Sequence, residues 1–369
     1  MPACHRPLPQ DRTLARAACA WSRGRLPSSG GCVVTALVEL SGARRVFREG
    51  VFGRGRPIVA LADCAISLAT GETLGVIGES GSGKTTLGRL ALRLDTPTEG
   101  SVRWLGQDVT HLPESRLRPL RPFLAQVAQD PYASLNPRVP VGTTIAEPLV
   151  NFGLASPAEA MARVPDLLRA VGLPADVGDR LPHAFSGGQR QRIAIARALA
   201  SEPKVIVCDE AVSALDLSVR AQIINLLISL QDRLGIGLLF IAHDALLVRH
   251  LAHRVIVMYR GRVVEEGPAT EILDAPAHPY TRTLLAAVPA RHPSKRAPRP
   301  IHVRAAAEPG QTDVGCPYQP RCPLAEALCS SLRPELAGDP KGRRVACHLV
   351  GAAASAGAVD PRTFPGLTD

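Results

Sequence analysis

Residues 78–85 constrain the fold of this chain more than any other segment, because they run Gly-Glu-Ser-Gly-Ser-Gly-Lys-Thr and fit the pattern G-x-x-x-x-G-K-[ST]. The apolar run 74–77 before them predicts a short buried strand, and residues 85–94 after them predict a helix. Glycines let successive backbone N–H groups turn toward phosphate oxygens, and the first turn of the helix adds a partial positive charge. The sequence therefore predicts a strand, a phosphate-binding loop (P-loop) and a helix in succession.

Two side chains of this loop have separate expected roles. Lys84 would reach the β- and γ-phosphates of a nucleotide as a point charge, and the Thr85 hydroxyl would coordinate Mg²⁺. A chance glycine-rich turn is the alternative, and the strand and helix on either side disfavour it. The residues predicted to bind the nucleotide here are Gly78, Glu79, Ser80, Gly81, Ser82, Gly83, Lys84, Thr85 and Thr86.

A pair of carboxylates follows a second apolar run, residues 205–208. A P-loop needs an acid at the end of a neighbouring strand to hold Mg²⁺, and Asp209 occupies such a position. Glu210 could then accept a proton from the water that attacks the γ-phosphate, or orient that water. An ordinary solvated Asp-Glu pair at a strand end is the alternative.

Short apolar strands alternate with helical segments along much of the chain. This alternation favours an α/β fold with a largely parallel sheet that is covered on both faces. One predicted helix, 218–234, places Ile223, Leu226, Leu227, Leu230 and Leu234 on a single apolar stripe. Strands are expected around 38–47, 58–68, 205–208, 238–241 and 255–258, and further helices at 158–171, 189–199 and 245–251.

Composition limits the classes of protein that remain. Hydrophobic residues make up 46% of the 369 residues, yet no stretch approaches 18 uninterrupted apolar residues, so we expect no membrane-spanning helix. Arginines at 12, 16, 23 and 25 interrupt any N-terminal signal segment, and we expect a soluble, intracellular chain. A formal charge of +10 would suit nucleic acid, but much of the excess lies in the two ends without interleaved aromatic residues.

Ser186, Gly187, Gly188 and Gln189 open the predicted helix 189–199. With Ser186 at the N-cap, the glycines leave backbone N–H groups free to face a phosphate. Together with the P-loop, this segment resembles the signature of the ABC ATPase family. In that family the phosphate belongs to nucleotide on the P-loop of the opposite subunit, so the resemblance implies two domains that sandwich two ATP molecules. A serine-glycine turn that merely caps a helix is the alternative.

Further positions match motifs of the same family. Gln129 matches the glutamine that contacts Mg²⁺ and the attacking water, and His243 matches the switch histidine that hydrogen-bonds the γ-phosphate. Residues 213–216, Ser-Ala-Leu-Asp, match the loop along the dimer interface, and Phe47 matches the aromatic residue that stacks on adenine. The alternatives are a surface glutamine, a capping histidine and a core phenylalanine. Phe185 replaces a more usual leucine without removing a charge or a phosphate donor.

The resemblance covers about residues 36–350. It implies a P-loop NTPase fold, with a RecA-like parallel sheet core, an antiparallel β portion and a helical subdomain at about 131–200. The expected divisions are a disordered tail or mis-assigned start at 1–35, an ABC ATPase domain at 36–290, a C-terminal extension at 291–350 that a basic, proline-rich linker opens, and a tail at 351–369. A start at Val33 or Val34 is one form of the mis-assignment.

Residues 129–137 and 277–281 are similar to the oligopeptide/dipeptide importer branch of this family. The resemblance implies a peripheral ATP-hydrolysing subunit on the cytoplasmic face of the membrane, with Mg²⁺ and ATP. It also implies transmembrane permease subunits, a second ABC ATPase subunit and, indirectly, a solute-binding protein. Importers of nickel or other solutes share the extension, so they remain alternatives. An ABC-type ATPase that acts on nucleic acid is less favoured, because one P-loop and one signature are present. A non-catalytic regulatory cassette is less favoured as well, because Glu210 and His243 are intact.

Nine cysteines are present, and four of them gather near the C-terminus: Cys316, Cys322, Cys329 and Cys347. Four thiolates in a segment too small for a core suggest a metal that holds it together. Some members of the peptide-importer branch carry a [4Fe–4S] cluster there, and tetrahedral Zn²⁺ is the chemical alternative. The spacing differs from the paired C-x2-C of common zinc ribbons, which favours iron–sulfur. Reduced thiols without metal are the third possibility.

Overall fold

The structure is a computed structural model that describes residues 36–48, 57–130, 134–213, 215–287, 314–338 and 342–350. The expected N-terminal tail, the proline-rich linker and the C-terminal tail lie outside these residues. Within the described residues, no helix combines the length and the apolar character that crossing a membrane requires. The expected divisions at 36–290 and 291–350 stay predictions.

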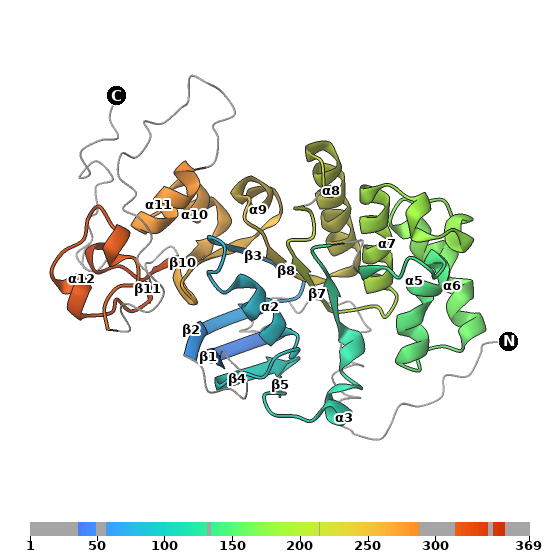
Figure 1. The fold of residues 1–369 in the computed structure, drawn as a ribbon, viewed down its shortest axis with the longest axis horizontal. Coiled ribbons are helices and arrows are strands. Elements are labelled where there is room, and N and C mark those ends of the chain that lie inside the picture. Colours follow the sequence, from blue (N-terminus) through green and yellow to red (C-terminus); the bar gives the residue numbers. More distant parts are fainter. Residues whose placement is uncertain are drawn as a thin grey trace, which may run out of the picture. The chain divides into compact units, whose positions relative to one another are not determined.

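A mixed sheet forms the centre of the fold (Figure 1). Its middle strands are parallel, and β10 and β12 run antiparallel to their neighbours. Among the described residues the strand order is β11 (Ala337–Gly338), β12 (Arg344–Val345), β10 (Arg262–Pro268), β9 (Arg254–Tyr259), β3 (Thr73–Ile77), β8 (Gly237–Ile241), β7 (Val205–Asp209) and β6 (Leu124–Val127). Burial on both faces explains the continuous apolar runs of β3, β7 and β8.

A second, antiparallel sheet has the order β2 (Pro57–Leu68), β1 (Val38–Arg48), β4 (Glu99–Trp104) and β5 (Gln107–Asp108) within the described part of the chain. Helix α2 (Lys84–Ala91) shares one hydrophobic core with both sheets, which includes Leu40, Leu87 and Ile256. The Trp104 indole N–H donates to the Ala91 carbonyl at 2.7 Å. The P-loop helix is therefore fixed between the two sheets.

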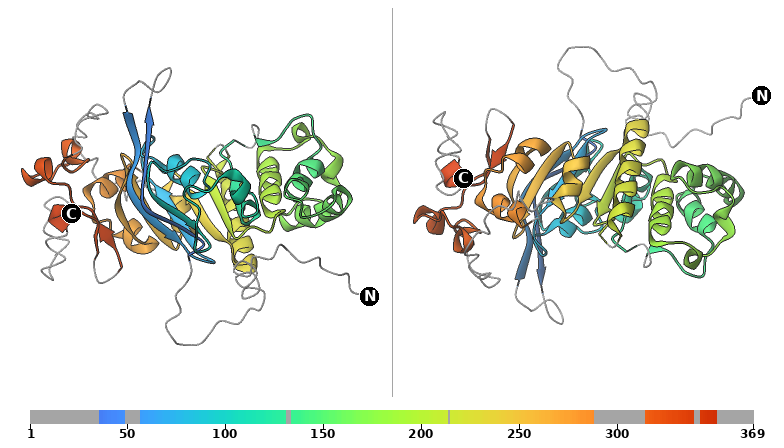
Figure 2. Two further views of the ribbon diagram at one scale, coloured as in Figure 1. Left: turned by 90° about the horizontal axis from the view of Figure 1, so that it is seen from below. Right: turned by 90° about the horizontal axis from the view of Figure 1, so that it is seen from above.

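Three helices of the middle section pack on one another, as both views of Figure 2 show: α5 (Val141–Asn151), α6 (Pro157–Ala170) and α7 (Gly187–Leu199). A second core joins them to the parallel strands. The other helices of the described residues are α3 (Glu114–Leu117), α8 (Leu217–Leu234), α9 (Ala245–Leu251), α10 (Ala269–Asp274), α11 (Pro279–Ala286) and α12 (Leu328–Ser331), with 3₁₀ turns at Arg121–Phe123, Val177–Asp179, Pro182–Ala184 and Gln319–Arg321.

The α/β fold with a parallel core and an antiparallel portion is confirmed, whereas several details differ from the prediction. Helix α2 ends at Ala91 rather than at residue 94, because Arg93 adopts a left-handed conformation with φ +48°. Leu234, expected on the buried stripe of α8, is half exposed at the last turn, and Ile224 is buried instead. Strands β4, β5, β6 and β10 were not predicted.

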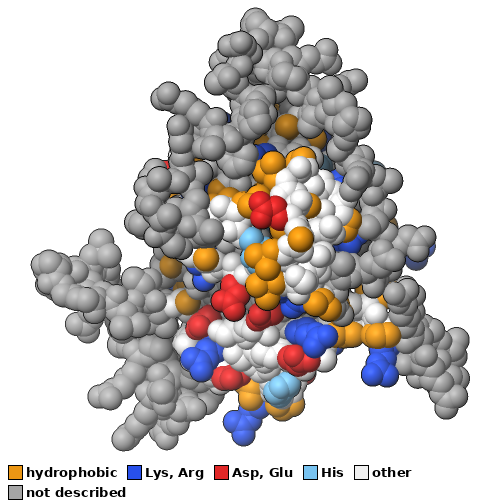
Figure 3. Space-filling view, turned by 90° about the vertical axis from the view of Figure 1, so that its left-hand side faces the viewer, with side chains coloured by type: hydrophobic (Ala, Val, Ile, Leu, Met, Phe, Trp, Pro, Cys, Tyr) orange, Lys and Arg blue, Asp and Glu red, His pale blue; other side chains and the backbone are white. Residues whose placement is uncertain are grey.

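The cysteine-bearing segment adds strands β11 and β12 to the edge of the central sheet. An ion pair between Arg344 and Glu266 accompanies the pairing of β12 with β10. Figure 3 looks at the end of the molecule that carries this segment, and its described part mixes hydrophobic side chains with charges of both signs. The extension is thus continuous with the central sheet through backbone hydrogen bonds, which the sequence did not indicate.

Candidate nucleotide site

The P-loop connects β3 with α2, and its glycines are required by the backbone. Gly83 is the N-cap of α2 with φ +100°, and a Cβ there would lie 2.5 Å from the Ala60 carbonyl oxygen. Gly78 has φ +156°, and a Cβ there would lie 2.3 Å from the Met258 carbonyl oxygen. Neither position accepts a side chain, so the loop requires glycine at both. The conformation that these glycines permit is of the kind whose backbone N–H groups can face an anion. Ser80, Gly81 and Thr85 are exposed at its surface.

Lys84 lies beneath this loop and is almost fully buried. Its ammonium group donates to the carbonyl oxygens of Gly78 at 2.8 Å and Glu79 at 2.9 Å. Burial lowers the pKa of Lys84, and the carboxylates of Glu210, Asp209 and Glu79 oppose that shift. The side chain is therefore held at the centre of the loop, where a phosphate could replace its carbonyl partners.

Asp209 and Thr85 meet at the end of strand β7. The Thr85 hydroxyl donates to Asp209 Oδ1 at 3.3 Å. Burial raises the pKa of Asp209, while the Thr85 hydrogen bond and the charges of Lys84 and Arg89 lower it. A hydroxyl and a carboxylate side by side are oxygen ligands of the kind that Mg²⁺ prefers, so this donor set fits the ion that accompanies a nucleotide.

Glu210 is the residue on which the other two predicted catalytic side chains converge. The Gln129 amide donates to Glu210 Oε2 at 3.0 Å, and His243 Nδ1 lies 3.7 Å from the same oxygen. Glu210 has φ +49°, a left-handed conformation that is costly for a residue with a side chain. Its N–H is held by the Ile241 carbonyl at 3.0 Å. Gln129, Glu210 and His243 thus lie together, as a catalytic assignment requires, although their roles stay predictions.

The signature residues cap helix α7. The Ser186 hydroxyl accepts a hydrogen bond from the Gln189 N–H, and the Gln189 side chain accepts one from the Ser186 N–H at 2.9 Å. A Cβ on Gly188 would lie 2.5 Å from Val219 Cγ1 of α8. In the part of the chain that the structure describes, the Ser186 and Gln189 side chains therefore serve the cap itself rather than the P-loop of the same chain. Their expected contact with a phosphate of a second copy stays a prediction.

The loop at 213–216 is held by an arginine that no sequence motif indicated. Arg220 donates to the carbonyl oxygens of Leu215 at 2.6 Å and Ser213 at 2.8 Å, while Ala214 lies outside the described residues. The loop therefore has a fixed shape on both sides of that residue. Its expected place at a dimer interface is not tested by these contacts.

Phe47 lies near the end of β1 with 37% of its surface exposed, so the core-packing alternative does not hold. The guanidinium of Arg45 lies 4.6 Å from the centre of its ring. An exposed ring with a cation on one face suits stacking on a base with its other face. The adenine contact stays a prediction.

Glu79 makes two contacts that the sequence motifs did not predict. Its backbone N–H donates to the Tyr280 hydroxyl at 2.8 Å, and its carboxylate accepts two hydrogen bonds from Arg321, at 2.8 and 3.0 Å. Tyr280 belongs to the segment 277–281, which resembles the importer branch and so carried a signal, whereas Arg321 carried none. Two residues more than 200 positions later in the chain therefore hold Glu79, the first variable residue of the P-loop motif, by hydrogen bonds.

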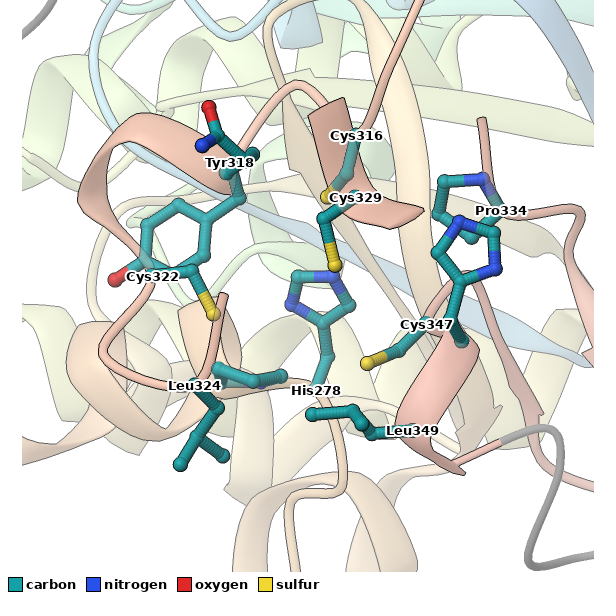
Figure 4. A pocket seen from close by; sticks show the side chains of 12 residues that line it. His278, Cys316, Tyr318, Cys322, Leu324, Cys329, Pro334, Cys347 and Leu349 are labelled. Carbon is teal, nitrogen blue, oxygen red and sulfur yellow. The ribbon is translucent and has the colours of Figure 1, made fainter. Parts of the chain in front are cut away.

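The four C-terminal cysteines line one pocket, together with His278 and Tyr318 (Figure 4). The sulfur atoms of Cys322, Cys329 and Cys347 point into the same space around the His278 ring. Burial raises the pKa of Cys322 to about 11, and neighbouring cysteines add to the shift. Among the described residues, however, no group of three His, Cys, Asp or Glu side chains is arranged to hold a metal ion. The described donors therefore share one pocket, but their side chains are not arranged as metal ligands in this structure.

Comparison with protein families assigns two regions of the chain. A family model described as ABC transporter matches residues 61–213, which include the P-loop, the signature and both carboxylates. A second model, described as the C-terminal region of oligopeptide/dipeptide transporters, matches residues 264–329. The second match includes Tyr280 and Arg321, and three of the four pocket cysteines.

Curated relatives match most of the chain. A protein of Sinorhizobium fredii, named Probable peptide ABC transporter ATP-binding protein, is 47% identical over 309 residues, which cover 83% of this chain and 87% of that protein. The dipeptide transport ATP-binding protein of Haemophilus influenzae is 42% identical over 86% of this chain and 97% of that protein. The glutathione import ATP-binding protein of Salmonella paratyphi A is 52% identical over 69% of this chain and 41% of that protein.

Solved structures show the same fold. A dimeric ATP-binding cassette bound to ADP and Pi is 30% identical and covers 63% of this chain and 98% of its own, with a TM-score of 0.57. A subunit of an ABC transporter complex from Clostridium perfringens is 27% identical over 65% of this chain and 92% of its own, also with a TM-score of 0.57. Fold, P-loop geometry and relatives agree, and the chain belongs to the family of ABC transporter ATP-binding proteins.

Proposed function

We propose that this chain is the ATP-hydrolysing subunit of an ABC importer that energises uptake of peptides, or a similar small solute, across the cytoplasmic membrane. The observation that carries the proposal is the convergence of Lys84, Thr85, Asp209 and Glu210 at one P-loop. The peptide, dipeptide and glutathione names of the relatives support the class of solute. The solute itself would be chosen by separate membrane and binding-protein subunits.

The proposed chemistry is positioning together with electrostatic stabilisation. Lys84 and the backbone N–H groups of the P-loop would hold the β- and γ-phosphates, and Thr85 and Asp209 would hold Mg²⁺, which supplies charge neutralisation on the phosphoryl oxygens. Glu210 would orient a water molecule, since Gln129 and His243 already lie against its carboxylate. The hydrogen bonds from Gln129 and to the Ile241 carbonyl hold Glu210 in its left-handed conformation before nucleotide arrives.

A second cassette would complete the site. Ser186 and the N-terminus of α7 offer an anion-binding turn whose side chains, among the described residues, bond to one another and not to the P-loop of the same chain. The dimeric form of a cassette bound to ADP and Pi supports a sandwich of two copies or of this chain with a sister ATPase. Permease subunits would hold the pair at the cytoplasmic face of the membrane.

Glu210→Gln tests the proposal. We expect the rate of phosphate release to fall about a hundredfold or more, while MgATP binding persists. The molecular mass in solution should shift toward that of a dimer, twice 39.1 kDa. The matched control is Glu335→Gln, an exposed carboxylate of the extension, which should hydrolyse ATP as the wild type does. Hydrolysis by Glu210→Gln at the wild-type rate would contradict the role of Glu210.

We further propose that Cys316, Cys322, Cys329 and Cys347 hold a [4Fe–4S] cluster, with Zn²⁺ as the alternative and reduced thiols as the third possibility. Their common pocket supports the proposal, although the side chains are not yet arranged as ligands. Anaerobically purified protein should absorb at about 400 nm and contain iron. Cys329→Ser should lose both signals and Cys208→Ser should keep them. Stoichiometric zinc, or no metal, would rule out the cluster.

A further inference from the structure

Arg321 is a side chain of the C-terminal extension that contacts the nucleotide site. Its guanidinium donates to both carboxylate oxygens of Glu79, from Nη1 to Oε2 at 2.8 Å and from Nη2 to Oε1 at 3.0 Å. This is the bidentate geometry in which arginine binds a carboxylate most specifically. Arg321 is 11% exposed and Glu79 is 40% exposed, so the pair is sheltered mainly on the arginine side.

The guanidinium is held in place by the residues around it. Its carbon atom lies 5.9 Å from the centre of the Tyr259 ring and 5.8 Å from that of Tyr318. These rings and Tyr280 form a cluster with centroid distances of 4.6, 5.3 and 5.4 Å. The backbone N–H of Arg321 donates to the Tyr318 carbonyl within the 3₁₀ turn Gln319–Arg321. Arg321 is therefore preorganised by the extension and by the tyrosine cluster together.

Glu79 is fixed at each of its polar groups. Its N–H donates to the Tyr280 hydroxyl, its carbonyl oxygen accepts from Lys84, and its carboxylate accepts from Arg321. The Lys84 ammonium donates to the Glu79 carbonyl oxygen at 2.9 Å, so the Glu79 carboxylate and the lysine belong to the same short loop. A negative charge thus stands next to the group that is to bind phosphate.

A carboxylate within an anion-binding loop opposes the binding of a polyphosphate, because like charges repel strongly in a partly buried site. Paired with a guanidinium, the carboxylate contributes no net charge and instead anchors the loop. We propose that Arg321 is a positioning residue of the nucleotide site, through which the C-terminal extension neutralises Glu79 and sets the P-loop for ATP. This inference rests on the proposed function, since it assigns the loop to ATP.

The test uses the full chain and compares the wild type with Arg321→Gln, Glu79→Gln and the double variant. We expect Arg321→Gln to raise the Kd of MgATP and the KM for ATP about three- to tenfold, with kcat within about twofold of the wild type. In the double variant the uncompensated carboxylate is gone, so its KM should return close to that of Glu79→Gln. Arg321→Lys keeps the positive charge but loses the bidentate geometry. Its affinity for MgATP should therefore lie between those of Arg321→Gln and the wild type.

The matched control is Arg344→Gln, which removes an ion pair between β12 of the extension and β10 of the central sheet without touching the P-loop. Its KM for ATP should equal that of the wild type. An unchanged KM in Arg321→Gln, additive effects in the double variant, or an equal rise in Arg344→Gln would each overturn the inference while leaving the proposed function standing. A wild type that does not bind MgATP would contradict both.

Discussion

Individual residues of the P-loop show most directly how sequence and chemistry are connected. Gly83 must adopt φ +100° beside the Ala60 carbonyl, so that the first turn of α2 can present its N–H groups. Lys84 then lies among backbone carbonyls and carboxylates that keep it in the loop despite its burial. The glycine makes the shape possible, and the lysine supplies the charge.

Replacing Gly83 by alanine should lower the free energy of unfolding by about 2–4 kcal/mol and abolish MgATP binding, because the added Cβ meets backbone and φ is unfavourable. Gly71→Ala is the matched control. Gly71 also has a positive φ, +67°, but no heavy atom beyond its two chain neighbours lies within 4 Å of a Cβ there, so only about 1 kcal/mol should be lost. Urea denaturation measures both, and equal losses would contradict the steric explanation.

Cys64 and Cys208 should be inert toward thiol reagents in the folded protein. Burial raises the pKa of each thiol to about 12, so at pH 8 only about one molecule in ten thousand carries either thiolate. Alkylation with iodoacetamide and subsequent peptide mass spectrometry should show both cysteines unmodified without urea and modified in its presence. Rapid labelling of the native protein would show that the strands around them open.

At the scale of helices and strands, two helices begin with the same capping box. Ser186 caps α7 and Ser156 caps α6. Each serine hydroxyl accepts from the backbone N–H of the residue three positions later, whose side chain accepts from the serine N–H. The two motifs are equivalent for local stability. They differ in the residues directly after the cap: Gly187 and Gly188 keep the start of α7 free of side chains, whereas α6 begins with proline.

Ser156→Ala and Ser186→Ala should each cost about 1 kcal/mol of stability, because each removes one cap hydrogen bond. Only Ser186→Ala should also lower ATP hydrolysis, by about tenfold or more, since a single phosphate contact of the transition state is lost. Thermal unfolding and phosphate release, measured on both variants, separate the two effects. Equal activity in the two variants would leave Ser186 with a capping role alone.

The sequence predicted the elements whose apolar runs are continuous or strongly periodic. Strands β3, β7 and β8 are buried on both faces, and α8 carries its stripe through Ile223, Leu227 and Leu230. Strand β4 alternates weakly, and β11 and β12 have two residues each, so their pairing depends on distant partners rather than on local pattern. Local periodicity carries no information of that kind.

At the scale of the whole molecule, the candidate site combines short-range and long-range information. The P-loop, Asp209 and Glu210 could be predicted because the residues of each motif lie within a few positions of one another in the sequence. The contact between Gln129 and Glu210 could be expected only through the family resemblance. Arg321 could not be predicted, because its partner lies 242 positions earlier, and the cysteines on either side of it, Cys316 and Cys322, indicated a metal site instead.

The described part of the extension therefore packs against the rest of the cassette and pairs with its central sheet. Its strands lengthen the central sheet, its Tyr318 joins the cluster against Tyr259 and Tyr280, and its arginine reaches the P-loop. The four cysteines surround the same region, with Cys322 directly after Arg321. The cysteines and the arginine that contacts Glu79 are therefore neighbours in the fold.

Calorimetric titration of the purified full chain with MgATP tests the nucleotide site most directly. The wild type should bind saturably, and Lys84→Ala should lose binding because the phosphates lose the lysine ammonium. Ser186→Ala should bind as the wild type does, since the nucleotide would bind the P-loop and the signature would contact it only across a dimer. A wild type that takes up no MgATP, alone or with its membrane subunits, would contradict the proposed function, as would undiminished binding by Lys84→Ala.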